Sequence, residues 1–391
     1  MKKKLLLIIP IIIIAILLII IGLSINNINL EKKKENKEAS LKEENNTYDV
    51  EVYSTTYLND LIKENVDDNQ LINTDILGKY TYTYKIGDEK KSIIVNVVDK
   101  TPPTVMLGNK YYHLIGTNFT ILDDTFCGDN YDDRPKCYVD GDIDTEKLGT
   151  YKAKYIAIDS SGNKYEKDFE VEVVEKSKPD NEQISLEEIK KRVGNNKLLI
   201  DVSKWQDDID WKKVKEAGID YAFMRLGTEK FSTNELLIDT FFEKNYKEAK
   251  ENNIKIGVYF YTYAKTVEDA ERHANFVVEN LKGKEIDLGV AYDWECWELY
   301  NGMNISIHKL NEIKDRFMEV IKSNNYRPLL YSSKNYLEKV WTINTDVWLA
   351  HYTENTNYSG DKIIWQFASN GKIPGIKNNT DVNVYYIDNE K

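Results

Sequence analysis

The first hydrophobic feature of the chain is a run from Leu5 to Leu23 that consists almost entirely of Leu and Ile, with one Pro. At 1.5 Å per residue, a helix of this length spans roughly 30 Å, the thickness of the hydrocarbon core of a membrane. The run is longer than the apolar core of a usual signal peptide, and no A-x-A-like cleavage site follows it. We therefore predict an uncleaved transmembrane helix with a cytoplasmic tip in residues 1–26, and a cleaved signal peptide is the alternative.

Positive charge on the two sides of this run bears on its orientation. The lysines at residues 2–4 favour a cytoplasmic N-terminus, while those at residues 32–34 weaken that signal. Because almost the whole chain follows the helix, we predict a single-pass protein of the cell membrane whose C-terminal domains are extracellular. Residues 27–47 are charged and rich in amide groups, with too little apolar surface to fold, and they predict a flexible stalk.

A repeated stretch with an apolar period of two follows the stalk. The sequence from Ile72 (INTDILGKYTYTYKI) is matched by the sequence from Ile143 (IDTEKLGTYKAKYIA), so this part holds two modules, at residues 48–100 and 101–176. Tyr alternates with Thr in YTYTY, and apolar residues alternate with Glu in FEVEV, which is typical of half-buried antiparallel strands. Turn residues separate these strands into hairpins. We predict two small all-β sandwiches.

The pattern changes after a polar linker with one short helix at residues 177–196. From Lys197 onward, apolar runs such as LLIDVS, YAFMRLG and IKIGVYFYTY alternate with amphipathic stretches such as FFEKNYKEAKENN and VEDAERHANFVVENL. Strands that alternate with helices form a parallel sheet. Residues 197–391 therefore predict an irregular, TIM-like β/α barrel whose last helices are reduced or missing. The predicted fold class is multidomain: a transmembrane helix, two sandwiches and an α/β barrel.

Composition narrows the function classes. The 391 residues include 53 Lys and Arg against 65 Asp and Glu, a net charge of -12, which argues against a nucleic-acid partner because phosphate binding needs clustered positive charge. The four histidines are isolated and no Cys or His spacing suits zinc, so neither a metal nor a cofactor is expected. Cys127 and Cys137 share one loop-like stretch, and from sequence a disulfide between them remains an open question.

Carboxylates that end apolar runs are the candidate catalytic residues, since barrel enzymes place their chemistry at the carboxyl ends of strands. Asp201 ends LLID, and Asp293 and Glu295 stand two apart in VAYDWE. Side chains two apart on a strand point to one face, about 6.5 Å from each other, so both enter one cleft. Close like charges and apolar surroundings keep one carboxyl protonated near neutrality, and such an acid can protonate a glycosidic oxygen. The structural alternative is that these acids cap loops or pair with Lys or Arg.

The same residues carry a family resemblance. The motifs IDVSKWQDDIDW, YAFMRLG, IGVYFY, AYDWE, VWLAHY, WQF and TDVNVY occur in the order seen in family 25 glycoside hydrolases, the lysozyme-like N-acetylmuramidases, and the resemblance covers residues 197–391. It implies hydrolysis of the β-1,4 bond between N-acetylmuramic acid and N-acetylglucosamine in peptidoglycan glycan strands, with retention. Residues 48–176 resemble bacterial immunoglobulin-like domains in their LGTY, DSSGN and VVDKTPP patterns, which implies spacer or adhesion modules.

The family resemblance also implies roles for single residues. Glu295 resembles the general acid/base, Asp293 the partner that orients the substrate's 2-acetamido group, and Asp201 and Asp381 the flanking acids. In that scheme the acetamido oxygen attacks the anomeric carbon to give an oxazolinium ion, and a covalent glycosyl-enzyme through Asp293 is the alternative. The residues expected to line the sugar subsites are Tyr259, Tyr261, Tyr292, Arg225, Tyr331, Trp348, Tyr352, Trp365 and Gln366.

Two positions depart from the family pattern. Asp207 stands where the family has Gly, and Phe260 replaces a frequent His, which puts a role of that side chain in substrate binding in doubt. With the acids all present, we predict a lysozyme-like peptidoglycan hydrolase that remodels the wall of a Gram-positive bacterium. A catalytically inactive wall-binding or adhesion protein is the alternative, and a hydrolase of chitin-like polymers is a third hypothesis.

Overall fold

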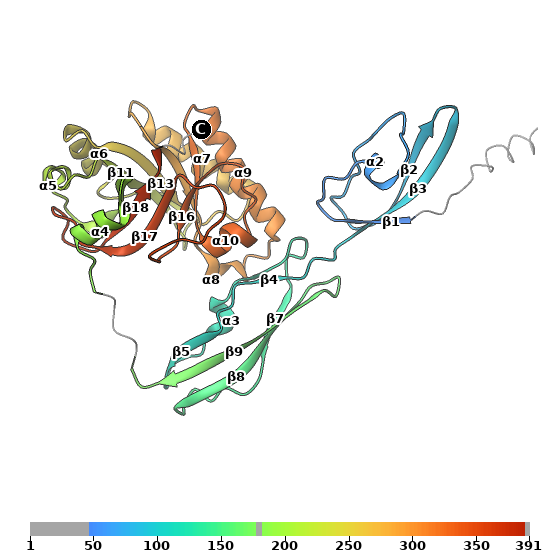
Figure 1. The fold of residues 1–391 in the computed structure, drawn as a ribbon, viewed down its shortest axis with the longest axis horizontal. Coiled ribbons are helices and arrows are strands. Elements are labelled where there is room, and N and C mark those ends of the chain that lie inside the picture. Colours follow the sequence, from blue (N-terminus) through green and yellow to red (C-terminus); the bar gives the residue numbers. More distant parts are fainter. Residues whose placement is uncertain (1–46, 177–181, 388–391) are drawn as a thin grey trace, which may run out of the picture. The chain divides into compact units, whose positions relative to one another are not determined.

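The computed structural model describes residues 47–176 and 182–387 (Figure 1). The chain divides into two compact units, Met1–Lys100 and Thr101–Lys391, which are described separately below. The second unit holds the second module and the C-terminal domain.

Helix length and polarity bear on the membrane prediction. The longest helix in the described ranges is α9 (Ile307–Ser323), whose 17 residues include lysines and acidic residues, and no described helix is long and apolar enough to cross a membrane. The predicted transmembrane helix, Leu5–Leu23, lies outside the described residues, as does nearly all of the predicted stalk. This finding contradicts the predicted membrane-spanning part of the fold and the predicted localisation at the cell membrane.

The described residues of the first unit, from residue 47 on, form one three-stranded sheet and one short helix. In the sheet order β1-β3-β2, β2 and β3 form an antiparallel hairpin, whereas β1 pairs with β3 in parallel. Ile93, Val95 and Val97 of β3 alternate on the buried face. The predicted antiparallel sandwich is wrong for this module, because its described residues form a single mixed sheet. The elements are β1 (Thr47–Glu51), α2 (Leu58–Leu61), β2 (Gly78–Ile86) and β3 (Glu89–Val98).

The second module has a four-stranded sheet in the order β5-β9-β8-β7. The antiparallel hairpin of β8 and β9 buries Tyr155, Phe169 and Val171, and β5 joins β9 in parallel. Since the separate pair β4–β6 is only two residues long, two full facing sheets are not formed by the described residues, and the predicted sandwich is wrong here too. The elements are β4 (Thr104–Val105), β5 (Lys110–Leu114), α3 (Ile121–Asp124), β6 (Cys127–Gly128), β7 (Lys136–Asp140), β8 (Gly149–Ile158) and β9 (Lys164–Val174).

The C-terminal domain is a closed barrel of eight strands. The strand order β10-β18-β17-β16-β15-β14-β13-β11 is closed by pairing of β10 with β11, and β12 extends β11 as a hairpin. All neighbours in the ring pair in parallel except β18, which runs antiparallel to both β10 and β17. The strands are β10 (Lys197–Val202), β11 (Tyr221–Lys230), β12 (Glu235–Ile238), β13 (Lys255–Tyr261), β14 (Gly289–Asp293), β15 (Pro328–Ser333), β16 (Asp346–Ala350), β17 (Ile364–Gly371) and β18 (Thr380–Tyr385).

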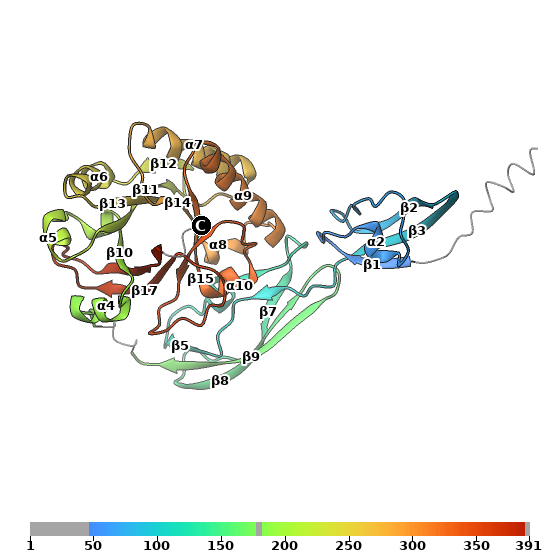
Figure 2. The ribbon, with the colours of Figure 1, turned by 45° about the horizontal axis from the view of Figure 1, so that its top comes forward.

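Helices cover the outside of this ring, as Figure 2 shows for α5, α6, α7 and α9. Most are amphipathic: α7 buries Ala270, Ala274 and Val277 at helical spacing and leaves polar residues outside. The helices of this domain are α4 (Leu186–Val193), α5 (Trp211–Glu216), α6 (Phe242–Glu251), α7 (Val267–Leu281), α8 (Trp297–Tyr300), α9 and α10 (Lys334–Lys339), with a short 3-10 helix, η1, at Lys204–Gln206.

Alternation along the strands separates two hydrophobic layers. Leu199, Phe223 and Trp348 belong to the cluster inside the barrel, whereas their sequence neighbours Ile200 and Ala222 belong to the layer between strands and helices. Side chains two residues apart share a face, so the inward-facing positions of each strand include the polar residues at its carboxyl end. The barrel thus sets which polar side chains meet at its open end.

Candidate active site

A pocket of about 420 Å³ opens at the carboxyl ends of the parallel strands, and all four acids singled out in the sequence line it. Asp201 comes from β10 and Asp293 ends β14, with Glu295 two residues further along. Asp381 lies at the start of β18, which brings it to the same end because this strand runs the other way. The β10–β18 register places Asp201 and Asp381 directly opposite each other.

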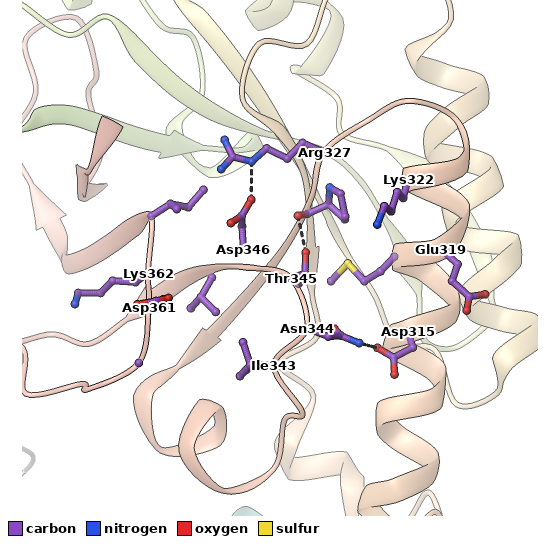
Figure 3. A pocket seen from close by; sticks show the side chains of 15 residues that line it. Asp315, Glu319, Lys322, Arg327, Ile343, Asn344, Thr345, Asp346, Asp361 and Lys362 are labelled. Atoms are coloured by element: carbon purple, nitrogen blue, oxygen red, sulfur yellow. Dashed lines mark hydrogen bonds and ion pairs between the residues drawn. The ribbon is translucent and has the colours of Figure 1, made fainter. Parts of the chain in front are cut away.

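A larger cavity of about 1150 Å³ lies at the other end of the barrel, where β15 and β16 begin (Figure 3). Two contacts join residues of its lining: Arg327 Nε donates to Asp346 Oδ2 at 2.6 Å, and Asn344 Nδ2 donates to Asp315 Oδ1 at 2.8 Å. In β/α barrels this end serves stability, and chemistry lies at the opposite end. The smaller pocket is therefore the candidate active site.

Asp293 and Glu295 both point into the pocket, whereas the side chain of Trp294 between them points to the opposite side, as alternation along a strand requires. Trp294 is fully buried, and its Nε1 donates to Ala264 O at 3.2 Å. Among the residues that the structure describes, Asp293 Oδ1 has no hydrogen-bond partner although Asp293 is only 4% exposed. A buried carboxylate oxygen without a partner is costly in a folded protein, and it is available to accept a hydrogen bond from a bound molecule.

Asp201 is held by a network of amides and ring hydroxyls. Its Oδ2 accepts hydrogen bonds from Gln366 Nε2 at 3.0 Å and Asn383 Nδ2 at 2.8 Å. Gln366 Oε1 in turn accepts from the hydroxyls of Tyr331 at 2.8 Å and Tyr352 at 2.9 Å. These contacts fix the Gln366 amide with its NH₂ toward the acid, so Asp201 is a rigid part of the pocket wall.

Burial is the main cause of raised pKa values in this cluster. It raises the pKa of Glu295 to about 7, with Asp201 as the next cause. Burial, followed by the charges of Glu295 and Asp201, raises the pKa of Asp293 well above its usual range. Burial also raises the pKa of Asp201 to about 6 and, with the charges of Asp201 and Glu295, that of Asp381 to about 9. The cluster therefore retains protons at neutral pH, as a general acid requires.

Seven of the nine residues expected to bind sugar line the pocket: Arg225, Tyr259, Tyr261, Tyr331, Trp348, Tyr352 and Gln366. The structure places Tyr292 and Trp365 elsewhere. Tyr292 packs against Phe317 in the layer under the helices, and Trp365 packs against Phe367 there. Each stands one residue from a pocket residue on its strand, so alternation turns its side chain to the outer face.

Arg225 makes its ion pair beside the acids rather than with them. Its Nε and Nη2 lie 2.8 Å and 2.7 Å from Asp239 Oδ2, and both side chains are largely buried. Asp239 also accepts from Lys204 N at 3.0 Å, at the start of the segment that leads to Trp205. The pair thus ties β11 to the loop after β10, and its positive charge lowers the pKa of Asp293 against the larger effect of burial.

Sequence reasoning missed several residues of the pocket. Trp205 lines the pocket and is 66% exposed, with Lys204 Nζ over its ring at 4.9 Å from the centroid, and its exposed surface suits stacking on a sugar. Asn383 does not line the pocket but holds Asp201, and it lies two residues after Asp381, so the alternation that selects the acid also selects this amide. The remaining ones are Val202 and Ser369, which lie on strands, and Ser203, Gln206 and Asn379, which lie in or beside loops.

The structure shows how Asp207 and Phe260, the two residues that depart from the family pattern, are accommodated. Asp207 has a φ of 53°, a conformation that favours glycine, and Asn378 Nδ2 donates to its Oδ2 at 3.2 Å. Phe260 is fully buried and packs against His273 and Phe276 outside the barrel, so it faces away from the pocket.

Replacing Asp381 with Asn is expected to stabilise the fold increasingly as the pH rises. An unfolded Asp loses its proton near pH 4, whereas the folded protein keeps it up to about pH 9, so wild-type stability falls through this window. Asn does not titrate. The unfolding temperature of the variant should therefore exceed that of wild type by a margin that grows between pH 5 and 8.5, measured by calorimetry, and a margin that shrinks would contradict the raised pKa.

Comparisons with known proteins find similarity in the part of the chain that forms the barrel. Residues 200–376 match the model of the glycosyl hydrolases family 25. The uncharacterized protein YegX of Escherichia coli is 25% identical over 199 residues, covering 48% of this chain and 68% of YegX. The autolytic lysozyme of Clostridium acetobutylicum is 22% identical over 192 residues, covering 48% of this chain and 55% of the lysozyme.

Among solved structures, the modular autolysin LytC of Streptococcus pneumoniae, in complex with a synthetic peptidoglycan ligand, is 28% identical with a TM-score of 0.43. The match covers 60% of this chain and 56% of LytC, so the chain spans little more than half the length of that autolysin and of the clostridial lysozyme. The family match over residues 200–376 identifies the barrel: the C-terminal domain of this chain belongs to the family 25 glycosyl hydrolases.

Proposed function

We propose that the barrel cleaves peptidoglycan glycan strands at the β-1,4 bond between N-acetylmuramic acid and N-acetylglucosamine, with retention. The observation that carries the proposal is the meeting of Asp201, Asp293, Glu295 and Asp381 in one pocket at the carboxyl ends of the barrel strands. The family match and the similarity to an autolytic lysozyme support the substrate.

In the proposed reaction, Glu295 is the general acid/base. Its pKa of about 7 leaves a large protonated fraction at neutral pH, and this proton goes to the glycosidic oxygen as the bond to the anomeric carbon breaks. The substrate's own acetamido oxygen attacks that carbon, and Asp293 accepts the amide N–H and stabilises the oxazolinium ion. Glu295, now ionised, takes a proton from the water that opens the ring, which restores the starting configuration.

Asp201 and Asp381 support the pair by their charge and by contact with substrate. After burial, the charge of Asp201 raises the pKa of both Glu295 and Asp293, and Asp381 adds a smaller contribution to the raised pKa of Asp293. The exposed ring of Trp205 and the hydroxyl of Tyr352 offer stacking and hydrogen bonding to successive sugars. The expected role in wall remodelling depended on the predicted membrane anchor, which the described helices do not support.

Digestion of purified peptidoglycan by the full chain tests this function. We expect new reducing ends on N-acetylmuramic acid residues, measured by reduction with borohydride and mass spectrometry of the muropeptides. Chitin oligomers, which lack the lactyl ether, should be cleaved much more slowly. An enzyme that released no reducing ends but still bound peptidoglycan would be the inactive wall-binding protein, and preferred cleavage of chitin oligomers would indicate a different glycan.

A further inference from the structure

The second module contacts the barrel through Phe126, which lies between α3 and β6. The ring is fully buried and belongs to the hydrophobic cluster of the barrel domain, outside the module's own core. Its centroid lies 4.4 Å from that of Tyr300 and 5.6 Å from those of Trp297 and Tyr336. Phe126 therefore fills an aromatic cage that the barrel domain builds from α8 and α10.

Asn301 fastens the same segment by hydrogen bonds. Its Oδ1 accepts from Cys127 N at 3.1 Å, and its Nδ2 donates to Thr125 O at 2.9 Å and Leu122 O at 3.2 Å. One side chain at the end of α8 thus satisfies three backbone groups of the module, on both sides of Phe126. Buried backbone groups need such partners, so the contact is specific rather than merely apolar.

The backbone of the module is shaped for this close approach. A Cβ atom at Gly128 would lie 2.7 Å from Tyr300 Cε1, so glycine is required there. Cys127, between Phe126 and Gly128, is joined by a disulfide to Cys137 on β7. The segment that carries Phe126 is therefore covalently tied to the module's sheet.

The aromatic cage is continuous with the catalytic pair. Trp297 stacks on Tyr336 with centroids 3.5 Å apart and packs edge-on against Trp294 at 4.7 Å. Trp297 N also donates to Glu295 O at 2.8 Å. Glu295 lies beyond the last residue of β14, so strand pairing does not hold it. Its position depends on the segment at residues 294–300, which forms two sides of the cage.

We propose that the second module is a built-in part of the active site, and that Phe126 is a positioning residue that holds residues 294–300 and thereby keeps Glu295 in the pocket. This inference rests on the proposed function, because it concerns the acid of that reaction. It assigns the module a role beyond that of a spacer or adhesion element.

The test compares wild type with Phe126→Ala and Phe126→Leu in the full chain, on soluble glycan strands. With the cage empty, we expect kcat to fall roughly 10- to 100-fold, since small displacements of a catalytic group cost that much, while KM changes less. Water that reaches Glu295 should also relax the effect of burial on its pKa, so the alkaline limb of the kcat profile should move to lower pH. Phe126→Leu fills part of the cage, so its kcat and the pH of its alkaline limb should lie between those of Phe126→Ala and wild type.

A general loss of folded protein would lower kcat without moving the pH profile, which separates the two explanations. Asn301→Ala removes three hydrogen bonds but keeps the cage, and it serves if Phe126→Ala does not fold. Tyr112→Ala, at an exposed ring of the same module, is the matched control and should leave kcat unchanged. If wild type is active and both Phe126→Ala and Phe126→Leu have its kcat and pH profile, the inference is overturned while the proposed function stands. If wild type is inactive, the proposed function and this inference are overturned together.

Discussion

Replacing Glu295 with Gln is expected to lower kcat on peptidoglycan by about 10²- to 10⁴-fold, the usual contribution of a general acid/base. Gln has the same shape and fills the same space, but it has no proton to give to the leaving oxygen. Because the Glu295 carboxyl lies in the pocket with the other acids and is not needed for strand pairing, folding and glycan binding should persist. Reducing-end release, measured under saturating substrate, gives the result.

Glu298→Gln is the matched control for this experiment. Glu298 follows three residues later on α8 and is exposed, and its charge adds only a lesser contribution to the raised pKa of Glu295. The control variant should stay within about 2-fold of wild type, as expected for an exposed position. Equal activity of Glu295→Gln and wild type would remove Glu295 from its proposed role.

Replacing Asp293 with Asn is expected to lower kcat by about 10²- to 10³-fold, the scale found when one preorganised electrostatic contact to a transition state is lost. Asn keeps an acceptor oxygen near the place of the unpartnered Oδ1, so the acetamido group can still be oriented, but no negative charge stabilises the oxazolinium ion. Substrate affinity should change little, and single-turnover kinetics separate this loss from binding.

The same variant bears on the alternative with a covalent intermediate. If Asp293 were the nucleophile, wild-type enzyme incubated with a slow substrate would gain the mass of one glycan fragment, and the Asn variant would not. With assistance from the acetamido group, neither protein should carry an adduct in intact-mass spectra. An adduct on wild type would contradict the substrate-assisted scheme.

Alternation along strands predicted the acids well because it is a local property. Asp201 and Asp293 lie on the inner faces of β10 and β14, and the two-residue spacing carries Glu295 to the same pocket. The same rule, applied consistently, would have excluded Tyr292 and Trp365. They were chosen for being aromatic, although each directly precedes a pocket residue on its strand.

Other features depend on pairings that a local pattern does not contain. An apolar period of two indicates a strand but not its partner, so the parallel pairs β1–β3 and β5–β9 were not foreseen, and the sandwiches were predicted wrongly. Asp381 lies at the start of its strand instead of at the end, because β18 runs antiparallel to its neighbours, and family resemblance was what pointed to it. Trp205 lies in a short 3-10 turn with no periodicity at all.

The two repeated modules differ in the segment that carries Phe126, the residue that packs into the aromatic cage of α8 and α10. In the second copy, residues 101–142 precede the stretch that the two modules share, whereas only residues 48–71 precede it in the first. Phe126, Cys127 and Gly128 all lie in this longer leader, so the features that fit the barrel come from outside the duplicated part. Exchanging the two copies would therefore leave the aromatic cage of α8 and α10 without Phe126.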